Sequence, residues 1–405
     1  MGSRRNNSMD GGLFSQIVLN SERRKAEARV FTAKRYLYSK IKAVPKGYFA
    51  GMRGLRGIGK TVMLLQLANE LPGSLYIPAD SSLIKGTGLY EAMHFAISRG
   101  YSSLFVDEIH CKKDWQQDLK TIYDEEGNTR VFFSGSAALE IGQGADLSRR
   151  ALLFDLLPLS FREFLAIKKK VAVPPAVSAK DLFDEDRRRQ LITATAQHAV
   201  HLRDYFRQGG LLYASEDTEY FHKALENTVE KIIHSDLECL RAIDANAEET
   251  IYKLLEWIAF SQPGEVNYST LASKTSASKP TVIRMIDDLT KTGLLKKILP
   301  CGKAVVRKEP KIYLAFPFRE YFNAVFARTP DTGALREEFF VNHAQKLCYL
   351  KTLRGQRTPD FIYENKTVEV GGGGKNFGQN PDYLIKDAVT LEPKTIPLYL
   401  TGYLY

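Results

Sequence analysis

Cysteine is scarce in this chain. Its 405 residues include only four, Cys111, Cys239, Cys301 and Cys348, and no two of them have the short spacing that zinc ligands show. In a reducing compartment such scattered cysteines stay as thiols. The sequence therefore predicts neither a disulfide nor a zinc site.

Long apolar runs are missing as well. No stretch approaches the roughly 18 uncharged apolar residues that a transmembrane helix needs. The N-terminus, MGSRRNNSMDGG, lacks the apolar segment of a signal peptide. Hydrophobic residues make up 44% of the chain and charged residues 26%, which is close to the average for soluble globular proteins. We therefore expect a folded, cytoplasmic protein with no membrane partner.

Positive charge is concentrated in two segments. The net charge is +10, yet residues 1–47 contain 11 Lys and Arg against 3 Asp and Glu, and residues 274–311 contain 10 against 3. The rest of the chain is therefore slightly acidic. Localised positive charge predicts an anionic partner, and the alternative is two solvated lysine-rich faces.

The first half of the chain has an α/β pattern. At about 100–200 residues per domain, 405 residues predict two to four domains. Residues 1–47 form a basic segment in which we expect one helix over 21–43, with Ser21 as its N-cap. Over residues 48–157, short apolar runs alternate with helical patterns, which is typical of a parallel sheet. This segment is the predicted core domain.

The second half begins with helices. Residues 158–260 lose the strand pattern and contain charged linkers and a Gly209-Gly210 break, so we expect a helical lid or connector. Residues 261–325 contain two short helical patterns and a basic two-stranded segment. Residues 335–405 contain a helix followed by strands. The predicted fold class is thus an α/β parallel-sheet core, a helical lid and two smaller C-terminal domains.

A glycine-rich motif follows the first apolar run. Residues 54–61, GLRGIGKT, match the phosphate-binding pattern GxxxxGK[S/T] between an apolar strand and an apolar helix. Backbone N–H groups of such a loop surround phosphates, and the helix N-terminus adds its positive end. We expect Lys60 to reach the β- and γ-phosphates of ATP and Thr61 to bind Mg²⁺. The residues expected at the nucleotide are Gly54, Gly57, Ile58, Gly59, Lys60, Thr61 and Val62.

Two carboxylates end a later apolar run. Residues 103–108, SLFVDE, have the form of a buried parallel strand that emerges at the edge of the sheet where the phosphates are expected. Asp107 is predicted to hold Mg²⁺ through water, and Glu108 to polarise the attacking water. Without the upstream glycine motif, the same pattern would be an ordinary strand end.

Further polar residues follow the next strand. Ser134 and Ser136 are candidates for contact with the γ-phosphate or the water, and the alternative is a serine-capped turn. Arg149 and Arg150 are candidates for the cation that offsets charge on the phosphates, within this subunit or from a neighbour. The alternative for them is a surface pair.

These motifs together resemble a known family. The series GLRGIGKT, LFVDEIH followed by DW, VFFSGSA, and LSRR with PLSFREF is similar to a microbial branch of the AAA+ ATPases. Members carry a C-terminal winged helix and a restriction-endonuclease-like tail, and the likeness covers about residues 30–405. It implies Arg149 or Arg150 as the arginine finger and Ser134 or Ser136 in the sensor position, where many relatives have asparagine. Relatives commonly work as rings, so an arginine that acts in trans would make hydrolysis depend on assembly.

Residues 261–325 fit a winged helix-turn-helix. Ser278 is a natural N-cap and Pro280 suits the first helical turn. The second helix would expose Lys279, Thr281 and Arg284, which makes them candidates for contact with double-stranded DNA. The alternative is that this module packs only against a protein partner or the ATPase core.

The tail resembles a nuclease of the PD-(D/E)xK type. Asp360 and Glu369 would hold a second Mg²⁺, with Glu338 on the preceding helix. Gly371 occupies the place of the lysine that should activate water, and Lys375 follows a run of four glycines from which it would have to reach back. A degenerate binding domain and an active nuclease are the two alternatives.

The predicted function is therefore an MgATP-dependent ATPase whose cycle controls DNA engagement. One alternative is an ATP-dependent switch that binds a protein partner. Another is an ATP-gated, magnesium-dependent DNA nuclease.

Overall fold

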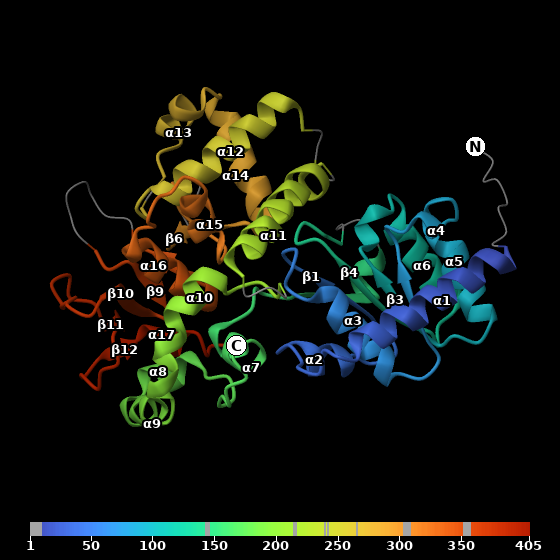
Figure 1. Ribbon diagram of the computed structural model, residues 1–405, viewed down its shortest axis with the longest axis horizontal. Helices are drawn as coiled ribbons and strands as arrows, with labels where there is room; N and C mark the ends of the chain where they lie inside the picture. The colour runs from blue at the N-terminus through green and yellow to red at the C-terminus, as the bar shows by residue number, and fades with distance from the viewer. Residues whose placement is uncertain are drawn as a thin grey trace. The chain divides into compact units, whose positions relative to one another are not determined.

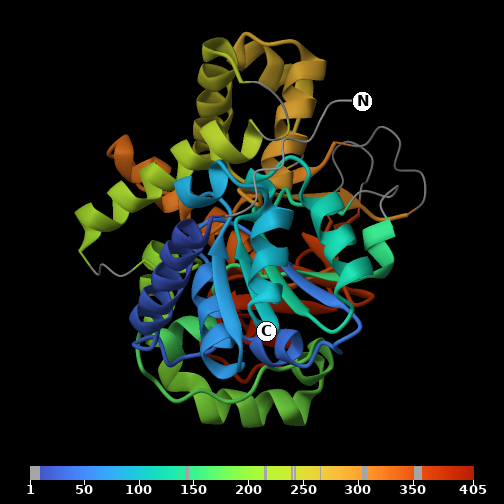
Figure 2. The same cartoon turned by 90° about the vertical axis from the view of Figure 1, so that its right-hand side faces the viewer.

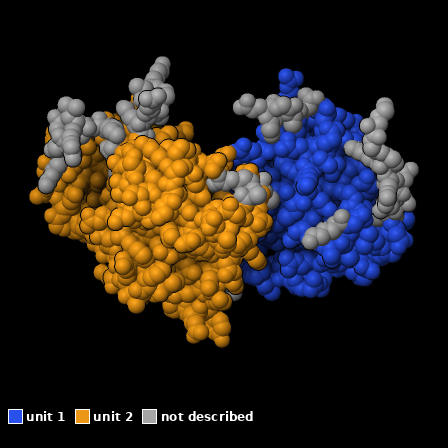
Figure 3. Space-filling view, turned by 90° about the horizontal axis from the view of Figure 1, so that it is seen from above, with its two compact units in different colours: residues 1–157 blue, residues 158–405 orange. Residues whose placement is uncertain are grey.

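The computed structural model describes residues 10–141, 146–213, 217–238, 240, 243–264, 266–302, 309–350 and 358–405. The chain folds as two compact units, residues 1–157 and 158–405 (Figure 3). The boundary coincides with the end of the predicted core domain.

The N-terminal unit is built on a parallel sheet. Its described residues form five strands in the order β2-β3-β4-β1-β5 (Figure 1). The strands are β1 (Phe49–Arg53), β2 (Ser74–Pro78), β3 (Ser103–Asp107), β4 (Arg130–Gly135) and β5 (Ala151–Asp155). The three central strands, β3, β4 and β1, are almost wholly buried, because apolar runs such as LFV and VFF have both faces covered. The prediction of a parallel α/β core is confirmed.

Helices connect and cover these strands. They are α1 (Gly11–Ala28), α2 (Tyr38–Lys42), α3 (Lys60–Glu70), α4 (Ser82–Lys85), α5 (Leu89–Ser98) and α6 (Trp115–Glu125), with short 3-10 turns η1 (Ile109–Cys111) and η2 (Asp146–Arg149). Helix α1 packs on α3 and β2, and it is drawn in dark blue in Figure 2. Phe14 and Ile17 of α1 are buried in the same core as residues of β2 and β3.

The predicted helix over residues 21–43 is wrong. Helix α1 begins ten residues earlier and ends at Ala28, and α2 is a separate short helix. Ser21 is not an N-cap but lies buried inside α1, where its hydroxyl accepts a hydrogen bond from the N–H of Tyr76 at 2.9 Å. The apolar side chains of Phe14 and Ile17 decide the start of the helix, because burial extends it toward the N-terminus.

Part of the positive charge of residues 1–47 is used inside the unit. Lys34 and Lys42 both pair with Glu70 at the end of α3, the latter at 2.6 Å. Hydrogen bonds from these two lysines lower the pKa of Glu70 to about 2. The basic segment is therefore held along α3 rather than presented wholly to solvent.

The second unit contains a mixed sheet. Its described residues form seven strands in the order β12-β11-β10-β9-β8-β6-β7. They are β6 (Leu295–Pro300), β7 (Lys311–Leu314), β8 (Cys348–Tyr349), β9 (Phe361–Tyr363), β10 (Lys366–Gly372), β11 (Tyr383–Asp387) and β12 (Thr395–Pro397). The antiparallel hairpin β6–β7 joins the tail because β6 pairs in parallel with β8. The predicted basic hairpin and the predicted tail domain thus share one sheet.

The helices of the second unit lie before, between and after these strands. They are α7 (Phe161–Ile167), α8 (Ala179–Phe183), α9 (Glu185–Thr195), η3 (Ala196–His201), α10 (Leu202–Gln208), α11 (Thr218–Lys231), the π-helical turn η4 (Ile232–Leu237), α12 (Ala245–Phe260), α13 (Tyr268–Thr275), α14 (Lys279–Lys291), α15 (Phe318–Val325), α16 (Thr332–His343) and α17 (Leu398–Thr401). The helical character predicted for residues 158–260 is confirmed.

The assignment of residues 158–260 to a separate lid is wrong for their first half. Phe161 packs edge-on against Phe339 of α16 and Tyr403 near the C-terminus, with ring centroids 5.9 and 6.3 Å apart. The Ser160 hydroxyl donates to the carbonyl of Tyr405 at 3.0 Å. Helices α7 to α10 share one hydrophobic core with β10, β11 and α17. The tail sheet needs an apolar cover, and an early segment of the chain supplies it.

The expectation that all cysteines are thiols is also wrong. Cys301 and Cys348 form a disulfide with a Cα–Cα distance of 5.1 Å. It joins the end of β6 to β8, which brings together residues 47 positions apart. Cys111 is exposed, and Cys239 lies outside the described residues. No helix in the described part of the chain is long and apolar enough to cross a membrane.

His343 is a buried neutral group in the core of the second unit. Its Nε2 accepts a hydrogen bond from the N–H of Phe161 at 2.9 Å, so its Nδ1 donates to the carbonyl of Phe339 at 2.7 Å. Burial lowers the pKa of His343 to about 3. The unfolded chain therefore takes up a proton near pH 6.5 that the folded chain does not.

We expect acid to destabilise the second unit through His343. As the pH falls below about 6.5 toward 3, the free energy of unfolding should drop by up to about 1.4 kcal/mol per pH unit. In His343→Gln this part of the slope should vanish, although the variant is less stable at pH 7. Denaturant unfolding at pH 7, 6 and 5 measures both effects. The exposed His234→Gln should keep the parental slope, and a parental slope in His343→Gln would contradict the assignment.

Candidate functional site

The glycine motif forms the turn between β1 and α3. Gly57 and Gly59 have φ angles of +80° and +94°, a left-handed region that L side chains rarely adopt. A Cβ on Gly54 would lie 2.4 Å from the carbonyl oxygen of Leu156. Each of these three glycines is therefore required by backbone geometry. Ile58, between two of them, is fully buried, and Val62 lies half-buried in the first turn of α3.

Lys60 is the first residue of α3 and is almost fully buried. Its Nζ donates hydrogen bonds to the carbonyls of Gly54 and Leu55, at 2.8 and 3.0 Å. The ammonium group thus lies against the loop that the motif predicts for phosphates. A buried cation at a helix N-terminus makes this loop strongly attractive to an anion.

Three hydroxyl groups converge on the carboxylate of Asp107, which is 3% exposed at the end of β3. Thr61 Oγ1 and Tyr76 OH each donate to Asp107 Oδ2 at 2.7 Å, and Ser134 Oγ donates to Oδ1. Thr61 and Asp107 offer the hard oxygen donors that Mg²⁺ prefers. The described geometry therefore fits the predicted metal, and these two residues would hold it.

Tyr76 was not predicted. Burial, followed by the charge of Asp107, raises its pKa well above the ordinary range, so it remains a hydrogen-bond donor. The signal in the sequence was a hydroxyl inside the apolar run SLYIP, on the strand that neighbours β3.

Glu108 has an unusual backbone. Its φ of +50° is left-handed, which costs a non-glycine residue about 1–3 kcal/mol and is typical of functional sites. Its Oε1 lies 3.8 Å from Arg56 Nη1, and its Oε2 lies 3.3 Å from His110 Nδ1. Sequence reasoning missed both neighbours, although Arg56 lies within the glycine motif and His110 lies two residues further along the chain. The carboxylate is thus held between the phosphate loop and the turn η1.

Ser134 and Ser136 are both buried at the end of β4. Besides its bond to Asp107, the Ser134 hydroxyl accepts the N–H of Glu108 at 3.3 Å. The N–H of Ser136 donates to His110 Nδ1 at 3.3 Å. The two serines therefore support the acidic pair, and contact with a γ-phosphate stays a prediction for both.

Arg149 and Arg150 lie at the other edge of the same sheet. The N–H of Phe49, at the start of β1, donates to the Arg150 carbonyl at 2.8 Å, while the phosphate loop follows the end of β1. A five-residue strand spans about 16 Å. Arg150 also pairs with Asp124 at 2.8 Å, and Arg149 is exposed. Either arginine would therefore have to act on the site of a neighbouring subunit.

Comparison with known proteins agrees with this geometry. Residues 48–165 match a family model described as "AAA domain", and residues 200–315 match one described as "Domain of unknown function (DUF8612)". Residues 48–165 are thus similar to an AAA domain, and residues 48–157 of this match lie in the N-terminal unit. Its parallel sheet, with the glycine loop between β1 and α3, is consistent with the P-loop fold of such domains.

Two relatives from Methanocaldococcus jannaschii are similar over different lengths. The uncharacterized protein MJ1637 is 29% identical over 370 residues, covering 80% of this chain and 76% of the relative. The uncharacterized protein MJ1544 is 27% identical over 162 residues, covering 38% of this chain and 36% of the relative.

Two solved structures align at 14% sequence identity. AMPPCP-bound DnaA from Aquifex aeolicus has a TM-score of 0.26, with 64% of this chain and 85% of that chain covered. PCH-2 of C. elegans has a TM-score of 0.25, with 71% and 70% covered. The similarity to an AAA domain is found in the family model and in the local geometry of the glycine loop.

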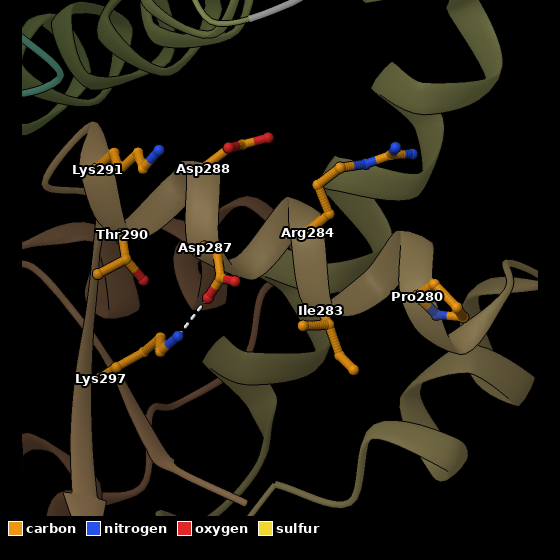
Figure 4. A pocket seen from close by; sticks show the side chains of 8 residues that line it. All are labelled: Pro280, Ile283, Arg284, Asp287, Asp288, Thr290, Lys291 and Lys297. Atoms are coloured by element: carbon orange, nitrogen blue, oxygen red, sulfur yellow. Dashed lines mark hydrogen bonds and ion pairs between the residues drawn. The ribbon is translucent and has the colours of Figure 1, made fainter. Parts of the chain in front are cut away.

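Beyond the AAA domain, α14 carries the predicted DNA-contacting residues. Lys279 and Arg284 are exposed, while Thr281 is half-buried and its hydroxyl lies 2.8 Å from that of the N-cap Ser278. A shallow groove runs along this helix (Figure 4). Its lining residues are Pro280, Ile283, Arg284, Asp287, Asp288, Thr290, Lys291 and Lys297. Asp287 pairs with Lys297 of β6, so the face has charges of both signs.

Asp360 and Glu369 meet on the hairpin β9–β10. The N–H of Asp360 donates to Glu369 Oε2 at 3.0 Å, and the N–H of Val370 donates to Asp360 Oδ2 at 2.9 Å. Glu369 is 1% exposed, and its Oε1 lies 2.5 Å from Lys375 Nζ. The lysine thus reaches back to the carboxylates from beyond the glycine run.

The side chain of Lys375 covers Gly371. A Cβ on Gly371 would lie 2.8 Å from Lys375 Cγ, so glycine is what allows this approach. Burial raises the pKa of Glu369, and the negative charge of Asp360 is the next largest cause. Among the described residues, however, no group of three His, Cys, Asp or Glu side chains is close enough to hold a metal ion. Asp360 and Glu369 would supply two ligands.

The helix residue near this pair is Glu337 and not Glu338. Glu338 forms a buried ion pair with Arg319 at 2.8 Å and accepts the N–H of Leu314, both in the interior. Glu337 accepts the hydroxyl of Tyr313 at 2.8 Å. Burial, followed by the negative charge of Asp360, raises the pKa of Glu337 to about 8. The prediction chose the wrong one of two adjacent glutamates, because a helix turns about 100° per residue.

We expect stability effects of very different size at these two positions. Glu338→Ala should lower the free energy of unfolding by about 3–5 kcal/mol, because it leaves the Arg319 charge buried without its partner. Glu337→Gln should change it by less than about 1 kcal/mol at pH 7, since a carboxyl with a pKa of about 8 is already protonated there. Guanidinium unfolding of both variants checks this, and equal losses would contradict the assignment.

Proposed function

We propose that this protein hydrolyses MgATP in its AAA domain. The observation that carries the proposal is the 2.7 Å hydrogen bond between Thr61 and Asp107, directly beside a glycine loop that ends in a buried Lys60. A hydroxyl, a carboxylate and an ammonium group in this order suit a metal-bound triphosphate. When bound, Mg²⁺ supplies positive charge that offsets the charge developing on the phosphates.

The residues of the chain would divide the remaining work. Backbone N–H groups of residues 57–62 and the Lys60 ammonium bind and orient the β- and γ-phosphates. Glu108 accepts a hydrogen bond from the attacking water and so positions it in line with the γ-phosphate. Arg56 and His110 lie beside this carboxylate, which makes both residues candidates for control of the step.

Assembly would complete the site. Arg149 and Arg150 lie about a strand's length from the phosphate loop of their own chain. We therefore assign the arginine finger to a neighbouring subunit in a homo-oligomeric ring, in which hydrolysis depends on assembly.

We further propose that the ATPase cycle controls engagement of double-stranded DNA. Helices α13 and α14 followed by the hairpin β6–β7 are similar to a winged helix, with Lys279 and Arg284 exposed on the second helix. Such helices enter the major groove. The acidic Asp287 and Asp288 on the same face favour the alternative, in which the module binds a protein partner, and salt-sensitive DNA affinity separates the two.

Steady-state ATP hydrolysis, with and without double-stranded DNA, tests the proposal. The parent should hydrolyse ATP, and DNA should change the rate. Lys60→Ala and Glu108→Gln should lower kcat at least about a hundredfold, because each removes a group that stabilises or positions the reaction. The exposed Lys46→Ala should behave like the parent.

A double variant, Lys279→Ala with Arg284→Ala, tests the proposed contact between α14 and DNA. It should keep the basal rate and lose the response to DNA, and its DNA affinity should depend less steeply on salt. Hydrolysis in the parent without any response to DNA would reject DNA engagement and favour a protein partner. If the parent hydrolyses no ATP even at protein concentrations at which it forms a ring, the proposed ATPase activity is rejected.

One observation favours a second activity in the tail. Lys375 lies over Gly371 and against Glu369, which gives the carboxylate pair the lysine that the linear motif lacks. We propose that Asp360 and Glu369 would hold a divalent cation and that Lys375 would activate water for hydrolysis of a phosphodiester in DNA. A degenerate binding domain remains the competing interpretation.

Cleavage of linear and supercoiled DNA in Mg²⁺ tests this second activity. The parent should cleave, and Asp360→Ala, Glu369→Ala and Lys375→Ala should each reduce cleavage at least about a hundredfold while retaining ATP hydrolysis. The exposed Lys366→Ala is the matched control. Absence of cleavage by the parent, with ATP present and absent, would leave the degenerate domain as the account of the tail.

A further inference from the structure

Arg35 is a buried cation that the nucleotide motif does not include. It lies in the loop between α1 and α2, is 5% exposed, and its guanidinium has two carbonyl partners. Nη1 donates to the carbonyl of Ile58 in the phosphate loop, and Nη2 donates to the carbonyl of Leu157 at 2.8 Å. One side chain therefore joins the loop to the last residue of the N-terminal unit.

The bond to Ile58 has a consequence for the next residue. The Ile58 carbonyl and the Gly59 N–H belong to one trans peptide, in which the two bonds point in opposite directions. Since Arg35 holds the carbonyl, the Gly59 N–H must point away from Arg35. Gly59 has a φ of +94° and no Cβ, so side-chain sterics do little to fix this peptide on its Gly59 side. Arg35 thus fixes the direction of one phosphate-binding N–H.

The other end of this contact lies where the chain leaves the unit. The Tyr36 hydroxyl donates to the Asp155 carbonyl at 2.9 Å and accepts the Leu157 N–H at 3.1 Å. Residues 155–157, which we call the exit segment, are therefore bound by Arg35 and Tyr36 together. The next residue along the chain, Pro158, begins the second unit.

The loop that carries Arg35 is itself attached to the nucleotide-binding helix. Gln66, on α3, donates from its side-chain nitrogen to the carbonyls of Phe31 and Ala33, at 2.6 and 3.0 Å. Helix α3 begins at Lys60, so a shift of its N-terminus is passed to the Arg35 loop. Phosphate loop, α3 and exit segment are thus mechanically connected through residues 31–36.

We propose that Arg35 and Tyr36 form a strut through which nucleotide binding at the phosphate loop changes the exit segment and, through the continuous chain, the second unit. This inference rests on the proposed ATP site. Arg35 is here a positioning residue, because it acts on the phosphates only through the Ile58–Gly59 peptide. The guanidinium is suited to the task because its rigid planar fork directs N–H groups of two separate nitrogens at two carbonyls, whereas a lysine ammonium donates from a single atom on a flexible stem.

The experiment measures nucleotide affinity and exit-segment protection in the full chain. Affinity is measured with the fluorescent analogue mant-AMP-PNP and Mg²⁺, and protection by hydrogen exchange in peptides that cover residues 150–160. In the parent, nucleotide should slow exchange in this region. Arg35→Ala should bind about tenfold more weakly and lose the effect. Arg35→Lys should bind within about threefold of the parent and still lose it.

Two further variants keep the test decisive. Tyr36→Phe removes only the hydroxyl, so it should fold and bind normally and yet lose the nucleotide-dependent protection, even if Arg35→Ala fails to fold. Lys46→Ala removes an exposed cation outside residues 31–36, and it should match the parent in both measurements.

The possible failures are distinguishable. Parental protection in Arg35→Lys or Tyr36→Phe would overturn the strut, as would a parent that binds the analogue without any change in exchange. A parent that does not bind mant-AMP-PNP would overturn the proposed ATPase, and the strut with it.

Discussion

The N-terminal unit depends on one buried carboxylate. Asp107 is withdrawn from water, and a buried charge is tolerated only when hydrogen bonds or opposite charges compensate it. Thr61 from α3, Tyr76 from β2 and Ser134 from β4 supply those bonds, so three elements distant in sequence must meet at the end of β3. The order β2-β3-β4 places the two strands beside β3 that this requires. The same carboxylate therefore helps to specify the fold and is the one that we propose would hold the metal.

The second unit has a different organisation, in which parts of the chain far apart in sequence complete one another. Residues 159–206 cover the sheet of the C-terminal tail, and the hairpin β6–β7 extends that sheet. The disulfide between Cys301 and Cys348 lies at the joint between hairpin and tail. Movement of α14 relative to the tail is thus restricted by both hydrogen bonding and a covalent bond. A conformational change transmitted to this unit would therefore move α14 and the tail sheet together.

Local patterns predicted the geometry of the glycine loop well and the arrangement of the carboxylates in the tail less well. The residues of the glycine loop are contiguous, and their left-handed angles follow from glycine itself, so the sequence is sufficient there. The sequence assigned Glu338 of the helix to this site, whereas Glu337 is the residue that feels the charge of Asp360. The rotation of the helix is set by the buried ion pair between Glu338 and Arg319, which the local pattern does not reveal. Lys375 could not be assigned from spacing, since its approach depends on how the glycine run bends.

By itself, the sequence determined the parallel α/β core, the phosphate-loop geometry and the helical character of residues 158–260. These follow from apolar periodicity and from the conformational range of glycine, which are properties of neighbouring residues. Only the tertiary structure decided that Arg35 contacts Ile58, that Tyr76 contacts Asp107, and that two of the four cysteines are joined. Such contacts depend on the three-dimensional path of the backbone. The free energy that selects that path is summed over the whole core, so no single segment of the sequence determines it.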